Sequence, residues 1–223
     1  MFPLKDTIPN ETAPLINSLF IILCTFVFLH EFSMAPGELD HFLDAWGVVP
    51  ALLTNNWSPH EMATVFSSMF LHAGWDHLIG NMWFLYLFGD NVEDRFGHVA
   101  YFFFYLFCGF VAAMTQVLIS PNSHVAMVGA SGAISGVLGA YFVFYPQSKI
   151  ITLFLMGIFS RLVEVPAVIF LGLWFAMQFL TGLGALAIAS PQEAGGVAFW
   201  AHVGGFVSGF VIAQFMPKPE YYS

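Results

Sequence analysis

Hydrophobic residues gather along the chain in long runs that carry few charges and are separated by short polar segments. A helix that crosses a membrane needs about 20 mostly apolar residues to cover roughly 30 Å of hydrocarbon. The pattern therefore predicts an all-α, polytopic membrane protein built as a bundle of six transmembrane helices. The predicted spans are residues 15–30, 76–89, 99–120, 125–145, 165–189 and 197–216.

A further apolar run, residues 150–160, is too short to cross and is predicted to be a connector at the membrane interface. The basic residues support this count of spans, because short cytoplasmic loops collect Lys and Arg. With six spans and both termini inside, all five basic residues lie on the cytoplasmic side: Lys5, Arg95, Lys149, Arg161 and Lys218. We therefore expect cytoplasmic tails at residues 1–14 and 217–223 around a membrane domain of residues 15–216. Residues 31–75 then lie outside, as amphipathic helices on the outer leaflet.

Composition excludes several other classes of protein. Of the 223 residues, 58% are hydrophobic and 9% charged, against about 25% charged in a soluble domain. The net charge of -9 and the absence of a basic patch argue against nucleic-acid binding. The first residues lack the features of a signal or transit peptide, so we expect a bacterial plasma (inner) membrane, with the lipid bilayer as a partner. Cys24 and Cys108 lie inside apolar runs without metal or redox spacing, so no disulfide, metal site or cofactor is expected.

Four polar side chains from three predicted spans fall at one depth in the outer half of the bilayer. Ser131 and His202 lie about six and five residues below the outer ends of their spans, roughly 9 Å at 1.5 Å per residue. His77 is at the mouth of the second span, with Asn81 one turn deeper on the same face. Such residues are functional candidates by default. A serine bonded to its own helix and a packed histidine remain alternatives, but matched depth favours a hydroxyl with its general base.

Small residues predict a close helix contact at the same place. Glycines spaced four apart allow two helices to approach closely. The face of the sixth span that carries His202 also carries glycines, so this face is expected to approach the fourth span. The glycines of the two spans are Gly129, Gly132, Gly136, Gly205 and Gly209.

Three motifs resemble those of the rhomboid intramembrane serine proteases, and they follow one another along the chain in the same order. They are the segment with His77-x-x-x-Asn81 and Glu93-x-Arg95, then Gly129-Ala130-Ser131-Gly132, and then Ala201-His202-Val203-Gly204-Gly205 with Gly209. The likeness covers about residues 14–216 and is to the bacterial type with a six-span core.

The resemblance implies a Ser-His dyad without a dedicated acid that cleaves single-span or polytopic membrane proteins. Carried over by position, Ser131 is the nucleophile and His202 the general base. His77, Asn81 and the Ser131 backbone N–H form the oxyanion hole in this interpretation. Glu93 and Arg95 are structural, tying the end of the second span to its neighbours.

One position departs from the family pattern. Many relatives carry an aromatic residue one turn after the nucleophile that packs on the catalytic histidine, and this chain has Ser135, which leaves the orientation of His202 open. Candidates for gating substrate access are the 190–196 loop and three aromatic residues of the fifth span, although lipid-facing packing is the favoured interpretation of each of the three: Trp174, Phe175 and Phe179.

Two other functions remain alternatives. A catalytically silent relative that binds membrane clients would be expected to lose Ser131 or His202, and both are present. A channel or transporter would need polar residues in the inner halves of the spans, where the fourth and sixth carry mainly glycine and apolar side chains.

Overall fold

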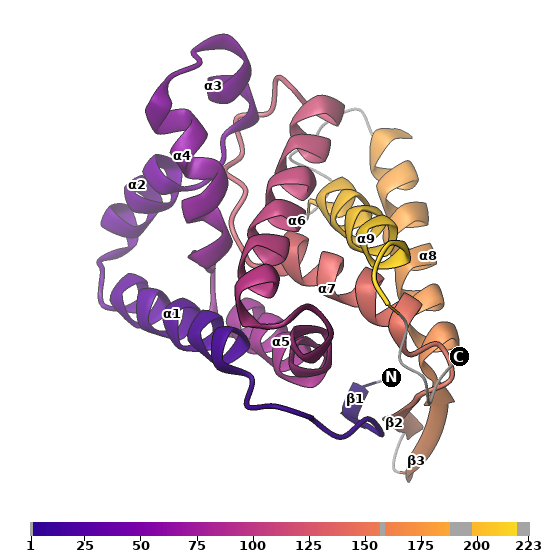
Figure 1. The fold of residues 1–223 in the computed structure, drawn as a ribbon. Helices are drawn as coiled ribbons and strands as arrows, with labels where there is room; N and C mark the ends of the chain where they lie inside the picture. The colour runs from indigo at the N-terminus through magenta and orange to yellow at the C-terminus, as the bar shows by residue number, and fades with distance from the viewer. Residues whose placement is uncertain (1, 157–158, 188–197, 218–223) are drawn as a thin grey trace.

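A computed structural model describes residues 2–156, 159–187 and 198–217 (Figure 1). The chain forms a bundle of helices with a small sheet at one end. The helices are α1 (Leu15–Phe32), α2 (Pro36–Trp46), α3 (Pro50–Asn55), α4 (Pro59–Ser67), the 3-10 turn η1 (Ser68–Phe70), α5 (Trp75–Phe96), α6 (His98–Ile119), α7 (Ser131–Phe144), α8 (Ala167–Ala187) and α9 (Phe199–Gln214). The strands are β1 (Phe2–Asp6), β2 (Lys149–Met156) and β3 (Phe159–Pro166).

Each predicted span overlaps one helix: α1, α5, α6, α7, α8 or α9. Three helices of the described ranges have both the length and the hydropathy of a membrane crossing, namely α1, α6 and residues Ala167–Leu186 of α8. The apolar helices α7 and α9 have only 14 and 16 residues. The short helices α2, α3 and α4 lie between α1 and α5 in the chain, where amphipathic helices were expected. The described part of the chain is thus mostly helical, and three of its helices meet both criteria for a span.

Two of these helices differ most in length from the spans predicted for them. α5 continues past Gly89 to Phe96, because Asn91, Val92 and Glu93 are buried in the next turn. α7 begins at Ser131 and not at residue 125. The preceding segment is instead held by a bridge between Met127 and Val48, a long-range contact that an apolar sequence does not reveal.

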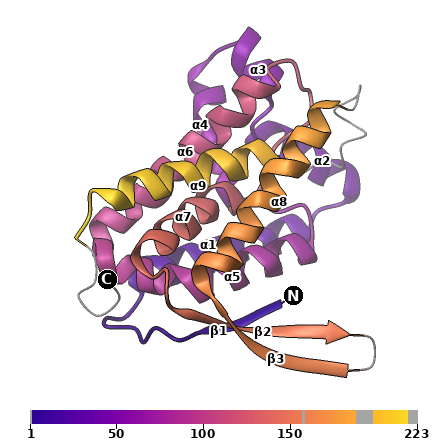
Figure 2. The ribbon, with the colours of Figure 1, turned by 90° about the vertical axis from the view of Figure 1, so that its right-hand side faces the viewer.

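The strands correct the prediction of an all-α fold. Residues 149–166 form an antiparallel hairpin of β2 and β3, with Lys149 opposite Pro166. The N-terminal segment, predicted as a tail, adds β1 to the other edge of β2, with Phe2 opposite Leu153. Side chains alternate between the two faces of a strand, so the run taken for an interface connector packs part of its apolar residues inward. Figure 2 shows the sheet at one end of the bundle.

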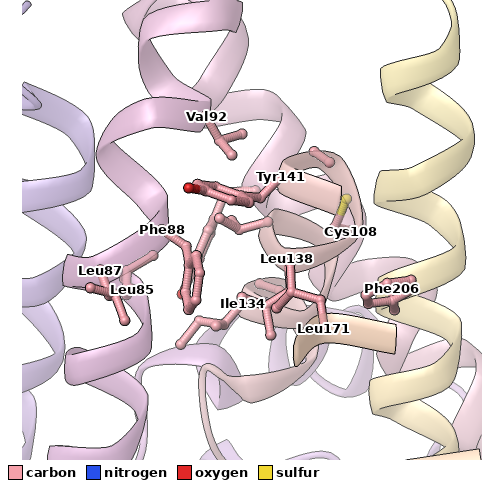
Figure 3. Close-up of a cluster of buried hydrophobic side chains, with 14 of the residues drawn as sticks. Leu85, Leu87, Phe88, Val92, Cys108, Ile134, Leu138, Tyr141, Leu171 and Phe206 are labelled. Carbon is pink, nitrogen blue, oxygen red and sulfur yellow. The ribbon is translucent and has the colours of Figure 1, made fainter. Parts of the chain in front are cut away.

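α7 forms the centre of the core. A helix that is apolar on all sides is stable only when it is surrounded by protein or lipid, and Ile134, Leu138 and Tyr141 of α7 are fully or almost fully buried. Figure 3 shows them among side chains of several helices. These neighbours include Leu85 and Phe88 of α5, Leu171 of α8 and Phe206 of α9. The nucleophile candidate therefore stands at the start of the most enclosed helix.

Glycines bring the backbones of α7 and α9 into contact. A Cβ atom at Gly205 would fall on the carbonyl oxygen of Gly132, and one at Gly209 would fall on that of Gly136. No side chain larger than hydrogen fits at either position without moving a helix. Gly129 does not belong to this contact, because it precedes α7 and lies against α5 instead.

Buried polar bonds tie together the end of the bundle where α5 ends and α1 begins. The Glu93 carboxylate, fully buried, accepts the backbone N–H groups of Ile16 and Asn17 at 2.9 and 2.8 Å and lies 2.6 Å from Nδ1 of His98. It therefore satisfies unpaired N–H groups at the start of α1, where a negative charge also complements the helix dipole. Arg95 donates to the carbonyl oxygen of Pro217 at 3.1 Å, which links α5 to the segment after α9.

Candidate functional site

Ser131 and His202 form a hydrogen-bonded pair between α7 and α9. Ser131 is the first residue of α7, and its Oγ lies 2.8 Å from Nε2 of His202. The Gly205 and Gly209 contacts of α9 bring the two helix axes close enough for this bond. The serine hydroxyl can donate to Nε2, which is the arrangement that a base-activated nucleophile requires.

The other nitrogen of the same imidazole meets a residue that the sequence analysis did not identify. Nδ1 of His202 lies 2.8 Å from Oε1 of Gln178, a residue of α8. One turn earlier on α8, the ring of Trp174 lies 6.0 Å from the imidazole, centroid to centroid, at 38°. The signal available in the sequence was a glutamine within an otherwise apolar run.

These contacts answer the question raised by Ser135. Its hydroxyl donates to the backbone carbonyl of Ser131 at 2.6 Å, so it stays within its own helix. The aromatic ring beside His202 comes from α8, as Trp174. The orientation of the imidazole is thus held from a neighbouring helix.

The two oxyanion-hole candidates of α5 share a cavity with the pair. His77, Asn81, Ser131, Gln178 and His202 all line one cavity of about 610 Å³. Asn81 Nδ2 is buried and has no hydrogen-bond partner among the described residues. A buried donor without a partner is costly, so this amide is suited to a ligand that brings an acceptor.

The start of α7 adds backbone donors to the cavity. The first helical hydrogen bond runs from the N–H of Ile134 to the carbonyl of Ala130 at 3.0 Å. The N–H groups of the three residues before Ile134 therefore have no acceptor within the helix. Gly129 has φ +122°, and a Cβ there would lie 2.6 Å from the His77 ring and 3.6 Å from Asn81 Nδ2. Glycine therefore permits both the backbone turn into α7 and the close approach of α5.

Behind His77, a buried carboxylate fixes the segment that leads into α5. Glu31 accepts the backbone N–H of His72 at 3.2 Å, and both side chains are almost fully buried. The His72 ring in turn packs edge-on against His77, with centroids 5.2 Å apart. Glu31 and His72 fall in the predicted outer segment and were given no role there. The carboxylate of Glu31 directly after an apolar run was the available signal.

The aromatic candidates for substrate gating contact α9. Phe175 packs against Phe206 with centroids 4.6 Å apart, and Phe179 packs edge-on against Trp200 at 5.7 Å. The 190–196 loop lies outside the described residues. Within the described ranges, no group of three His, Cys, Asp or Glu side chains is placed to hold a metal ion.

Comparison with known proteins identifies the family. The model of the Rhomboid domain matches residues 59–219, well over half of the chain. This chain is a member of the rhomboid family. Its rhomboid domain includes every residue of the cavity described above.

Rhomboid relatives come from plants and bacteria. RHOMBOID-like protein 1 of Arabidopsis thaliana is 31% identical over 167 residues, which are 73% of this chain and 36% of that protein. Rhomboid-like protein 11, chloroplastic, of the same plant is 39% identical over 100 residues, 44% of this chain and 34% of the relative. Rhomboid protease GluP of Bacillus subtilis is 29% identical over 150 residues, 67% of this chain and 25% of GluP.

The chain spans a quarter to about a third of the length of these three relatives. The family is one of membrane proteins and includes a named protease. Relatives named for the chloroplast and the mitochondrion show that rhomboid proteins are not confined to one membrane.

Proposed function

We propose that this rhomboid protein is a serine endopeptidase that cleaves other membrane proteins, single-span or polytopic, within or near their membrane segments. The observation that carries the proposal is the 2.8 Å approach of Ser131 Oγ to His202 Nε2 at the wall of a cavity of about 610 Å³. The two side chains form the catalytic dyad, and no cofactor takes part.

In the proposed mechanism, His202 takes the hydroxyl proton as Ser131 attacks the carbonyl carbon of the scissile peptide bond. The protonated imidazole then donates that proton to the departing amine, which leaves an acyl ester on Ser131. Water attacks the ester with His202 again acting as base, and the acid product is released. These are the two steps of nucleophilic catalysis by serine.

The oxygen of the scissile carbonyl becomes negatively charged when Ser131 attacks. Hydrogen-bond donors already in place around this oxygen stabilise the charge. We assign this role to His77, to Nδ2 of Asn81 and to the backbone N–H of Ser131. Asn81 has the unpaired buried donor that the role requires, and the Ser131 N–H stands at the positive end of the α7 dipole. Removing one such donor costs about 3 kcal/mol of transition-state stabilisation.

The proposed setting is a plasma membrane crossed six times, with both termini in the cytoplasm. α7 and α9 complete the bundle as short helices, and α5 carries Asp76 in its first turn and its other charged residues near its C-terminal end. Substrate segments with small or helix-breaking residues suit the site, because a hydrogen-bonded helix hides its carbonyl groups from a nucleophile.

The test is cleavage of a reporter with a small-residue-rich span, in liposomes, by wild type and by the Ser131→Ala and His202→Ala variants. Ser208→Ala is the matched control, since that hydroxyl of α9 donates to the Gly205 carbonyl at 2.7 Å. We expect the two dyad variants to lose cleavage by at least about 1,000-fold, and the control to keep it.

Labelling with a fluorophosphonate probe checks the nucleophile independently of any substrate. Wild type should be labelled and Ser131→Ala should not. Full cleavage by Ser131→Ala would refute the proposal. A wild-type protein that neither cleaves nor labels, while GluP does so in the same liposomes, would favour a catalytically silent client-binding protein.

A further inference from the structure

We infer that Gln178 of α8 is the positioning residue for His202, fixing which imidazole nitrogen carries the proton. The inference rests on the proposed protease function and adds a third member, from a third helix, to the Ser131–His202 pair. It is carried by the 2.8 Å distance between Gln178 Oε1 and His202 Nδ1.

The two nitrogens of a neutral imidazole have opposite roles. One carries a hydrogen and donates, and the other accepts. For His202 to take the proton of Ser131, Nε2 must be the acceptor, so Nδ1 must carry the hydrogen. A buried N–H needs an acceptor of its own, and the Gln178 side-chain oxygen provides one. The three groups then form a chain in which Ser131 donates to His202 and His202 donates to Gln178.

Gln178 is placed for this contact by the helical repeat of α8. Trp174 and Gln178 are four residues apart, on the same face of the helix, and both contact the His202 ring. The neighbouring Met177 is 55% exposed on the outer side. A glutamine in an apolar span is costly unless its amide is bonded, so the inward contact accounts for its presence among aliphatic side chains.

Among the residues that the structure describes, no carboxylate takes the place of Gln178 at this nitrogen. The titratable side chains that line the cavity beside His202 are Asp76 and His77, both from α5. From α7, Ser131 and Ser135 face the cavity. A neutral amide orients the imidazole and selects its tautomer, but it does not add a full negative charge to stabilise the protonated ring.

Three variants separate positioning from a general structural role. Gln178→Leu removes the acceptor and keeps the bulk. Gln178→Glu keeps the length and places a carboxylate on Nδ1. Met177→Leu changes the adjacent outward residue and is the control. For each, kcat and KM are measured on the liposome reporter between pH 5 and 9, together with the rate of fluorophosphonate labelling.

We expect Gln178→Leu to lower kcat and the labelling rate by about 100-fold with KM little changed, less than the roughly 10,000-fold loss caused by the wrong tautomer in a serine triad. Gln178→Glu should retain cleavage and move the acidic limb of the pH profile upward by about one unit, because a nearby carboxylate stabilises the imidazolium. Met177→Leu should match wild type.

The outcomes distinguish this inference from the proposed function. If Gln178→Leu and Gln178→Glu keep the wild-type rate and pH profile while Ser131→Ala is inactive, the role of Gln178 is refuted and the protease stands. Full activity of Ser131→Ala refutes the protease itself. If Gln178→Leu does not fold, the pH profile of Gln178→Glu decides alone: an upward shift supports positioning, and an unshifted profile overturns it.

Discussion

The helix that carries His202 and the helix that contacts its ring are attached to the bundle in different ways. α9 meets α7 backbone to backbone, through Gly205 and Gly209. α8 lies at the edge of the bundle (Figure 1) and exposes a row of apolar side chains, including Leu173 at 50% and Leu180 at 65%. It contacts the site through side chains, Trp174 and Gln178. The distance between Ser131 and His202 is thus set by main-chain packing, and the contacts that orient the imidazole ring come from a peripheral helix.

The largest expected effect comes from adding one methyl group to the α7–α9 contact. Gly209→Ala would place a Cβ on the Gly136 carbonyl, so the helices must separate. We expect a loss of about 3 kcal/mol of stability from overpacking, and loss of fluorophosphonate labelling because Ser131 and His202 move apart. Tm in detergent and the labelling rate measure the two effects.

Gly184→Ala on α8 is the matched control for this change. A Cβ at Gly184 meets nothing within 4 Å, so Tm should stay the same or rise slightly, since alanine favours helix over glycine. Equal effects of the two substitutions would contradict the contrast between α9 and α8.

A smaller effect is expected at the opposite end of the bundle, where Glu93 caps α1. Glu93→Gln keeps the shape of the side chain and one acceptor oxygen. It removes the negative charge and the second oxygen, so the N–H groups of Ile16 and Asn17 no longer both have a carboxylate acceptor. The expected cost is about 1 to 2 kcal/mol, measured by unfolding in mixed micelles.

Glu164→Gln is the control for that measurement. Glu164 is about half exposed and pairs with Lys149 at 2.6 Å, and exposed ion pairs contribute at most about 1 kcal/mol. If this exposed substitution cost as much as Glu93→Gln, the buried cap would have no special role in fixing the bundle.

The smallest effect concerns pH and the N-terminal strand. Burial raises the pKa of Asp6 from 3.8 to about 6, although the hydrogen bond from Tyr141 partly opposes the shift. The folded protein therefore binds the proton more tightly than the unfolded chain, so this stability is full below about pH 4 and is lost as pH rises through 6. Because β1 is a short strand at the edge of the sheet, we expect a change below about 1 kcal/mol.

Asp6→Asn keeps an acceptor for Tyr141 and cannot ionise. Its Tm should therefore vary less than that of wild type between pH 4 and 8, with the variant the more stable at pH 8. Parallel Tm curves for the two proteins would show that the ionisation of Asp6 does not contribute.

The sequence predicts the long helices and four residues of the cavity, because apolar runs and polar residues inside them are local signals. Ser131, His202, His77 and Asn81 could be named from depth and motif. The start of α7 could not, since residues 125–130 are as apolar as a helix interior and are held by a partner, Val48, far away in the chain.

The sheet and Gln178 were missed for a related reason. The pairing of β1 with β2 joins residues 144 to 151 positions apart, and the apolar run of β2 alone predicts a connector and not a strand. The role of Gln178 depends on α8 lying beside α9 with the face that carries Trp174 and Gln178 turned toward His202. Both features depend on which elements become neighbours, and this information is spread over the whole chain.

α7 is short for a helix in a membrane, and this has a consequence for the lipids around it. Its 14 residues rise about 21 Å, against roughly 30 Å of hydrocarbon. Since Ser131 is the first of these residues, the proposed six-span setting puts it below the membrane surface by an amount that depends on bilayer thickness. A thicker bilayer must thin around the protein or hold the cavity farther from water. Under the proposed mechanism, acyl-chain length would thereby control how readily water, the second substrate of hydrolysis, reaches the acylated serine.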